Sequence, residues 1–213
     1  GPAITFHPGT QCLSPGAWES YIKAASKIAQ DAGVRLQTLN VGGGFPGDRG
    51  AKPVDLKVIF NRIKAAKERY FSDHNSVLIC EPGRGLVADA FALVLRVKNM
   101  RPNGAVVLND GIYGALAEWR DMPPVHPRHI TVFNPKGAER RGKPAPRVIF
   151  GPTCDSLDRL SDPLALPADI AEGDFVLIQG TGAYSAVLTS RFNGYGCAKQ
   201  IFCTALKSTS RHF

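Results

Sequence analysis

Hydrophobic residues follow two alternating spacings over the first 80 residues of the chain. Short apolar runs at 3–6, 34–41 and 77–80 are typical of buried strands. Between them, apolar residues recur at helical spacing, from Ser14-Pro15 to Gly33 and from about Val54 to Phe71. Strands that alternate with helices predict a parallel sheet with the helices packed outside it.

The spacing changes at about Ala92, where the helical period ends. Short runs rich in Val, Ile, Leu and Phe then alternate with Pro, Gly and Asn turns, which predicts strands at 93–97, 105–108, 129–133, 147–150 and 175–178. A polar, basic loop is expected at 135–146. The fold class we predict is therefore α/β plus all-β, with a β/α part at 1–90 and an antiparallel β domain at 91–213.

Three strands with two helices are an incomplete unit, because each open edge of the sheet exposes unpaired backbone groups. We therefore expect a partner segment on the N-terminal side to complete the sheet. With 44% hydrophobic residues the chain can bury a core. It has no apolar run near the roughly 18 residues of a membrane helix, and no signal pattern at its start, so we expect a cytoplasmic protein without a membrane partner.

The cysteines and the net charge narrow the function classes. Five cysteines, an odd number with no CxxC pair, argue against a disulfide framework and a zinc site, so no metal is expected. The net charge of +8 raises the alternative of nucleic-acid binding. Basic residues are dispersed, however, apart from 128–147 and 199–211, and no aromatic residues alternate with them. A mildly basic enzyme, or attraction for an anionic cofactor, explains the charge equally well without nucleic acid.

Each strand of the first part ends in a polar or glycine-rich cluster, where β/α proteins place their sites. Gly42, Gly43 and Gly44 allow the main chain to approach a ligand and to direct N–H groups at an anion. Arg84, after the next strand, can add a forked cationic contact. Either motif alone is more often a tight turn or a surface arginine, but their position on successive strand ends favours a phosphate site.

Glu81 and His7 stand at the same strand ends. A lone glutamate is usually an ion-pair partner, and a lone histidine is usually structural. Beside a heterocyclic phosphate cofactor, however, Glu81 can keep a ring nitrogen protonated and His7 can pack flat on the ring.

Cys154 follows a predicted strand and is flanked by carboxylates. Nearby negative charge disfavours a thiolate, so this position suits a proton donor better than a permanent nucleophile. A cysteine-protease site is disfavoured, because no histidine stands at a recognisable spacing.

Six motifs in this order resemble the fold-type III pyridoxal-phosphate-dependent decarboxylases, which act on ornithine, lysine, arginine or diaminopimelate. The motifs are Phe6–Thr10, Gly42–Gly47, Glu81–Arg84, Gly151–Asp158, Gly182–Tyr184 and Phe192–Tyr195. Cys154–Asp158 and Phe192–Tyr195 are more similar to the ornithine and lysine branch. The resemblance implies the C-terminal part of a TIM-type β/α barrel followed by a β domain. It also implies a homodimer with shared active sites.

The resemblance also implies roles for individual residues toward pyridoxal 5′-phosphate and a small amino-acid substrate. His7 would stack on the pyridoxal ring and Glu81 would pair with its nitrogen, whereas the phosphate would be bound by Thr10, Gly44, Gly83, Arg84 and Tyr184. Cys154 would return a proton to the substrate α-carbon. Asp155, supplied to the neighbouring subunit's site, would recognise the distal amine. Glu118 would meet the same amine, with Asp121 as a competing candidate.

Two departures from the family pattern bear on function. Pro8 and Thr10 stand where the family usually has an aliphatic residue and a serine, which would shift His7. The early barrel strand that ends in the cofactor-binding lysine is absent, so the chain alone is expected to be inactive. We expect a basic amino-acid decarboxylase represented by its C-terminal half. The alternative is a non-catalytic regulatory paralogue that pairs with a decarboxylase or its regulator.

Overall fold

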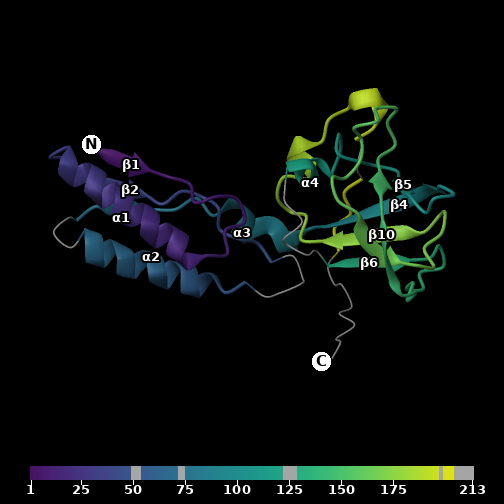
Figure 1. The fold of residues 1–213 in the computed structure, drawn as a ribbon, viewed down its shortest axis with the longest axis horizontal. Coiled ribbons are helices and arrows are strands. Elements are labelled where there is room, and N and C mark those ends of the chain that lie inside the picture. The colour runs from purple at the N-terminus through teal and green to yellow at the C-terminus, as the bar shows by residue number, and fades with distance from the viewer. Residues whose placement is uncertain (49–53, 72–74, 122–128, 197–198, 204–213) are drawn as a thin grey trace.

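The computed structural model describes residues 1–48, 54–71, 75–121, 129–196 and 199–203. Two helices and a small sheet lie at one end of the elongated chain, and a larger set of strands lies at the other (Figure 1). The segment with helix α3 (Gly83–Val87) and the 3₁₀ turn η1 (Ala88–Ala90) connects them. Cys197, residues 122–128 and the tail from 204 onward lie outside the described residues.

The first part contains a three-stranded parallel sheet in the order β1-β2-β3. Its strands are β1 (Ala3–Thr5), β2 (Thr38–Asn40) and β3 (Val77–Ile79), and its helices are α1 (Pro15–Asp31) and α2 (Leu56–Tyr70). The predicted strands and helices are confirmed here, except that β2 is shorter than the apolar run at 34–41. The N–H of Val34 donates to the carbonyl of Ala29 at 2.9 Å, so the start of that run closes the end of α1.

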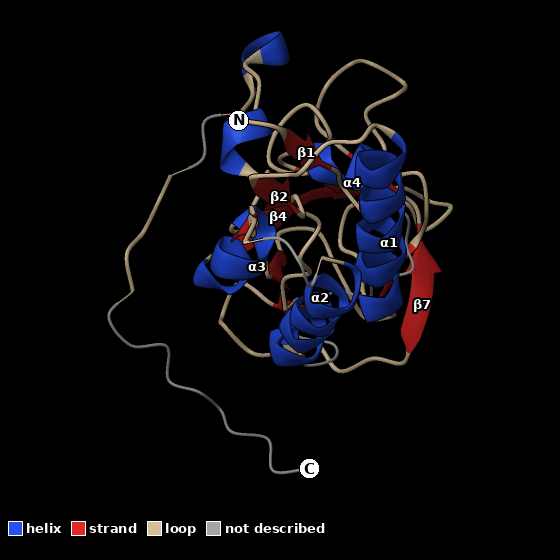
Figure 2. Ribbon diagram, turned by 90° about the vertical axis from the view of Figure 1, so that its left-hand side faces the viewer, coloured by secondary structure: helices blue, strands red, loops and turns tan. Residues whose placement is uncertain are grey.

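Helices α1 and α2 pack against each other and cover one face of this sheet (Figure 2). The sheet contributes a row of paired residues to their common core, namely Ile4, Leu39 and Leu78. Side chains alternate across a strand, so the neighbouring residues face the other way. On that face Val77 is 60% exposed and Ile79 is 42% exposed. Among the described residues, the outer edges of β1 and β3 have no partner strand.

The second part contains a five-stranded sheet in the order β6-β10-β4-β5-β8 and a separate ribbon of β7 with β9. The strands are β4 (Ala92–Met100), β5 (Val106–Leu108), β6 (Ile130–Phe133), β7 (Pro144–Arg147), β8 (Ile149–Phe150), β9 (Leu164–Pro167) and β10 (Phe175–Gln179). Its core is distinct from that of the first part, and the side chains of Val176 and Ile178 are fully buried in it.

The expectation of a purely antiparallel domain is wrong for one pair of strands. Strand β5 pairs with β8 in parallel, with Val106 opposite Ile149. Between them the chain passes through helix α4 (Ala117–Asp121), β6 and β7, and it therefore returns in the same direction without a hairpin. Strand β9 was not predicted, because prolines at 163 and 167 make that segment look like a turn.

After β10 the chain turns back to the connecting segment. The N–H of Thr181 donates to the carbonyl of Phe91 at 3.1 Å, and the N–H of Gly182 donates to that of Ala88 at 2.9 Å. A Cβ on Gly182 would lie 1.7 Å from the carbonyl oxygen of Val87. Only glycine permits this approach, which ties the loop after β10 to the first part of the molecule. The 3₁₀ turns η2 (Ala186–Leu188) and η3 (Phe192–Gly194) follow.

None of the helices in the described ranges is long and apolar enough to cross a membrane. Within the same ranges, no group of His, Cys, Asp and Glu side chains is arranged to hold a metal ion.

Candidate active site

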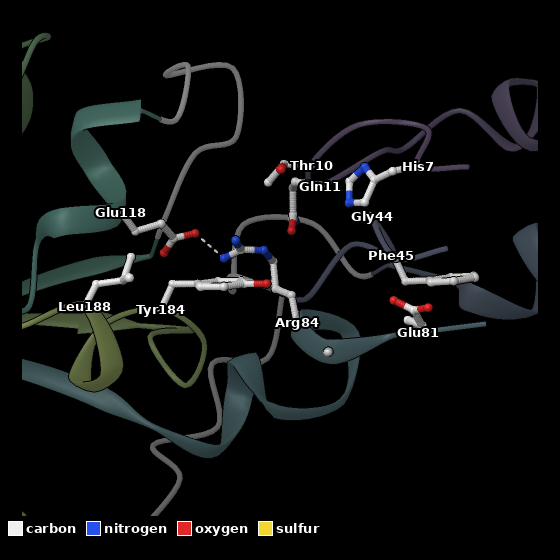
Figure 3. Close-up of a pocket in the computed structure, with 12 residues that line it drawn as sticks. His7, Thr10, Gln11, Gly44, Phe45, Glu81, Arg84, Glu118, Tyr184 and Leu188 are labelled. Carbon is white, nitrogen blue, oxygen red and sulfur yellow. Dashed lines mark hydrogen bonds and ion pairs between the residues drawn. The ribbon is translucent and has the colours of Figure 1, made fainter. Parts of the chain in front are cut away.

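A pocket of about 450 Å³ lies where the two parts of the chain meet (Figure 3). Its volume is within the usual range for small-molecule sites. It is lined by His7, Thr10, Gln11, Gly43, Gly44, Phe45, Glu81, Gly83, Arg84, Glu118, Tyr184 and Leu188. The structure therefore brings together most of the site residues predicted from the sequence, and it adds Gln11, Phe45 and Leu188.

The glycine-rich loop forms one wall and is held to the loop after β1. Gln11 is buried, and its side chain both donates to the carbonyl of Gly47 at 2.8 Å and accepts from the N–H of Gly47 at 3.1 Å. The N–H of Cys12 donates to the carbonyl of Gly44 at 2.8 Å. These bonds fix the position of the loop main chain before any ligand binds.

The glycines in this loop differ in what they offer a ligand. Gly42 does not line the pocket, and its N–H donates to Oδ1 of Asn40 at 2.9 Å. The N–H groups of Gly43 and Gly44 meet no acceptor among the described residues. Gly44 has a φ of +81°, and a Cβ there would lie 2.3 Å from the carbonyl oxygen of Gly9. This wall therefore presents two available donors on a backbone that requires glycine.

Glu81 is oriented by a residue that the sequence reasoning missed. Nδ2 of Asn40 donates to Oε1 of Glu81 at 2.6 Å, while the N–H of Glu81 donates to the carbonyl of Gly42 at 2.9 Å. Asn40 ends β2, and a polar residue at the end of a predicted parallel strand was the available signal. Its amide fixes one carboxylate oxygen of Glu81 at the edge of the pocket.

His7 occupies the neighbouring strand end. Its Nδ1 accepts a bond from the N–H of Gly9 at 3.0 Å, which fixes the ring and places the proton of the neutral form on Nε2. A Cβ on Gly43 would lie 3.5 Å from that Nε2, so the ring stands beside the glycine wall.

Arg84 lies at the centre of the pocket (Figure 3). Its guanidinium forms an ion pair with the carboxylate of Glu118, and the two side chains are only 7% and 6% exposed. Its Cζ is 4.8 Å from the centroid of the Tyr184 ring, within the range of a cation–π contact. Arg84 belongs to α3, whereas Glu118 belongs to α4 and Tyr184 to the loop after β10. The side chain of Asp121 is outside the described set.

Cys154 and Asp155 are not among the lining residues. Cys154 is exposed, and its Sγ accepts from Nδ2 of Asn193 at 3.3 Å. Asp155 accepts from the hydroxyl of Tyr113, and its Oδ1 accepts from the N–H of Leu157 at 2.9 Å. The bond from Tyr113, followed by that from Leu157, lowers the pKa of Asp155. The same contact raises the pKa of Tyr113.

Asp158 holds the loop that carries these two residues. It is 1% exposed, and it accepts from the N–H of Ile112 at 3.0 Å and from the N–H and hydroxyl of Thr153 at 3.0 and 2.7 Å. A Cβ on Gly151 would lie 2.2 Å from its carboxylate oxygens, so the loop needs glycine there. Cys154 and Asp155 therefore stand on a fixed turn and do not line the pocket of their own chain.

A family model described as pyridoxal-dependent decarboxylase, C-terminal sheet domain, matches residues 24–182. The chain belongs to this family. It is 31% identical over 213 residues to an ornithine decarboxylase of Cricetulus griseus, covering 90% of this chain and 45% of that protein. It is 32% identical over 205 residues to a lysine/ornithine decarboxylase of Selenomonas ruminantium, covering 93% and 49%. The chain thus spans about half the length of the curated decarboxylases it matches.

Solved decarboxylase structures share the fold. A lysine/ornithine decarboxylase from Vibrio vulnificus in complex with cadaverine has a TM-score of 0.73 and 27% identity, over 95% of this chain and 55% of that one. An arginine decarboxylase of Paramecium bursaria Chlorella virus, bound to agmatine, has a TM-score of 0.72 and 26% identity, over 91% and 52%.

Proposed function

We propose that this chain supplies the phosphate- and ring-binding part of a pyridoxal-phosphate-dependent decarboxylase that converts ornithine or lysine to a diamine. The observation that carries the proposal is the convergence in one pocket of the glycine loop, Arg84, Glu81 and His7. Family membership supports it, because the relatives named above are decarboxylases of basic amino acids.

The residues present fit the phosphate of the cofactor. The N–H groups of Gly43 and Gly44 are available donors, and Arg84 supplies a buried cation. Backbone donors and a guanidinium are the groups that proteins use for phosphate. Thr10, Gly83 and Tyr184 line the same region and complete the phosphate side, whereas Gly42 acts by shaping the loop.

The residues on the other side fit the ring. Glu81, held by Asn40, would accept a hydrogen bond from the protonated ring nitrogen and keep that nitrogen positively charged, and His7 would pack against the ring. When bound, pyridoxal phosphate withdraws electrons from the substrate α-carbon, so that the carboxylate can leave as carbon dioxide. The ion pair of Glu81 with the ring nitrogen sustains that withdrawal.

We assign protonation of the α-carbon to Cys154 and recognition of the distal amine to Asp155. Both residues lie outside the pocket of their own chain, which agrees with a homodimer in which each subunit lends them to the other's site. The lowered pKa of Asp155 keeps its carboxylate ionised for a cationic side chain. Glu118, inside the pocket, is the second carboxylate for that amine.

The open face and edges of the first sheet imply further strands. Exposed Val77 and Ile79 would be covered if the sheet closed into a TIM-type barrel, whose interior is filled by such side chains. In this proposal the boundary with the β domain lies near residue 90. The added strands, from the same or another chain, would carry the lysine that binds the cofactor covalently.

The test uses the complete protein that contains this chain. It should release carbon dioxide and form putrescine from ornithine or cadaverine from lysine. Arg84→Ala should weaken the binding of pyridoxal phosphate by about one to two decades, because a charge-assisted bond to the phosphate is lost. The matched control is Arg35→Ala, on an exposed residue outside the pocket. Equal affinity in Arg84→Ala and the parent protein would remove Arg84 from the phosphate site.

A regulatory function is the second candidate, and one comparison favours it. The chain is 30% identical over 211 residues to antizyme inhibitor 2 of Xenopus laevis, covering 90% of this chain and 45% of that protein. A paralogue of that kind would keep the fold without turnover. Borohydride reduction with pyridoxal phosphate, followed by mass spectrometry, separates the two: a lysine adduct in the complete protein supports the enzyme, and its absence supports the regulator. The 213-residue chain alone should show neither adduct nor decarboxylation.

A further inference from the structure

The pocket contains one contact that the proposed function does not explain. Arg84, assigned to the phosphate, is already paired with Glu118, assigned to the substrate amine. Both side chains are buried and both line the pocket. The two residues come from different parts of the molecule, and Figure 3 shows Glu118 extending toward Arg84 from the β domain.

The charges favour replacement of the Glu118 carboxylate by phosphate at Arg84 over simultaneous binding of both anions. A buried guanidinium without an anion is strongly unfavourable, so some anion must accompany Arg84 at all times. A phosphate at the Gly43 and Gly44 donors meets that requirement and carries more charge than a carboxylate. Once phosphate is present, Glu118 faces like charge at short range, and its pairing with Arg84 loses its advantage.

We propose that Glu118 is an internal competitor for Arg84, displaced by phosphate, and that its displaced carboxylate then forms the binding site for the distal ammonium group of an amine ligand. This inference rests on the proposed function. Phosphate binding would thus create the anionic site for the amine, and the two ligands would bind in order.

The surroundings of Glu118 support the second half of this exchange. It is 6% exposed, and Leu188 and the Tyr184 ring line the same side of the pocket. A carboxylate displaced from Arg84 there carries a negative charge beside apolar surface, which favours an approaching cation. An alkyl chain that ends in an ammonium group matches that apolar wall and supplies the charge.

The exchange predicts a reciprocal coupling between two binding sites. If phosphate raises the affinity for an amine by some factor, the amine must raise the affinity for phosphate by the same factor. The coupling factor between phosphate and amine affinity should decrease to one when the residue at position 118 carries no charge. A merely structural Glu118 would produce no such coupling.

The experiment measures binding to the complete protein freed of cofactor, in its wild-type and Glu118→Gln forms. The probes are inorganic phosphate, pyridoxal phosphate, pyridoxal without the phosphate, and putrescine. Glu118→Gln should bind both phosphate compounds at least about tenfold more tightly than wild type, since a charged competitor for Arg84 is removed. Its affinity for pyridoxal should equal that of wild type. Glu68→Gln, the same change on the exposed surface of α2, is the control and should match wild type.

The putrescine arm tests the coupling. In wild type, saturating phosphate should raise putrescine affinity about tenfold, and in Glu118→Gln it should not. Thermal unfolding guards against a folding defect: Glu118→Gln should melt lower than wild type without phosphate and gain more from its addition. Unchanged or weaker phosphate binding in a folded Glu118→Gln protein overturns the inference. Failure of wild type to bind pyridoxal phosphate at all overturns the proposed function and the inference with it.

Discussion

The two parts of the chain contribute to the pocket in different ways. The first part offers main chain in addition to side chains: the glycine loop, locked by Gln11, presents N–H groups on a backbone that tolerates no other residue at Gly44. The β domain contributes side chains, with Glu118 and Tyr184 reaching across to Arg84. In the proposed function the glycine loop faces the cofactor phosphate, whereas Glu118 of the β domain faces the substrate.

The same two parts also differ in how complete they are. The five-stranded sheet buries the inward-facing residues of β10, Val176 and Ile178, completely in a core of its own. The parallel sheet buries Leu39 toward its helices but leaves Val77 and Ile79 exposed on the opposite face. Stability of the β domain is therefore internal, whereas that of the parallel sheet depends on what covers its open face.

The largest expected effect separates binding from turnover. Cys154→Ala in the complete protein should slow decarboxylation on the order of 100-fold to 10,000-fold, the usual loss for a positioned acid. Affinity for pyridoxal phosphate should stay unchanged, because Cys154 is assigned to neither the phosphate nor the ring contacts. Diamine, aldehyde and aminated cofactor are to be measured together, since a misdirected proton would leave the amino group on the cofactor and release the aldehyde. Normal turnover to diamine alone would show that Cys154 is not the acid.

A pair of core substitutions compares the stability of the two parts. Ile178→Ala and Leu39→Ala each remove a fully buried side chain and should each cost about 2–5 kcal/mol of unfolding free energy. Hydrogen exchange resolved by segment is the measurement. Ile178→Ala should speed exchange in β4, β6 and β10 while sparing β2. Equal acceleration throughout both parts for either variant would mean that they unfold as one unit.

A pair of glycine substitutions tests the main-chain wall. Gly44→Ala forces a side chain into a backbone with φ of +81° and against the carbonyl of Gly9, and it should weaken pyridoxal phosphate binding roughly tenfold or more. Gly33→Ala is the matched control, because its φ of +63° gives similar backbone strain while a Cβ there meets nothing within 4 Å, and Gly33 does not line the pocket. Similar affinities for the two variants would argue against a role for the loop backbone.

The smallest effect concerns Tyr113 and Asp155 in the β domain. Tyr113→Phe removes the main cause of the lowered pKa of Asp155, so that pKa should rise toward its ordinary value, as measured by NMR titration. A carboxyl whose pKa is lower in the folded state stabilises the protein at pH values above its unfolded-state pKa. This stabilisation is lost as the pH falls through the folded-state pKa. The stability difference between parent and variant should therefore shrink below about pH 4. An unshifted Asp155 titration would mean that the hydroxyl does not bond to it.

Local patterns were sufficient to predict α1, α2 and most strands, because each depends on spacing and turn residues within one segment. The glycine loop, Glu81 and Arg84 were also predictable, since strand ends of one parallel sheet meet at one edge. The parallel pairing of β5 with β8 was not, because the spacing of apolar residues carries no pairing direction. The bonds from Asn40 to Glu81 and from Arg84 to Glu118 join distant segments, and only the fold reveals them.

The hydrogen bonds of Thr181 and Gly182 to the segment at 88–91 have a mechanical consequence. They link the loop after β10 to the segment that connects the two parts. The absence of a side chain at Gly182 allows the two segments to come into contact. Because of this link, the two parts cannot separate widely to admit a ligand. The distance between the two walls of the pocket is therefore nearly constant. In the proposed decarboxylase, selection among amino acids of different length would then depend on how far their side chains reach across this gap, and a bulkier residue at position 182 would change its width.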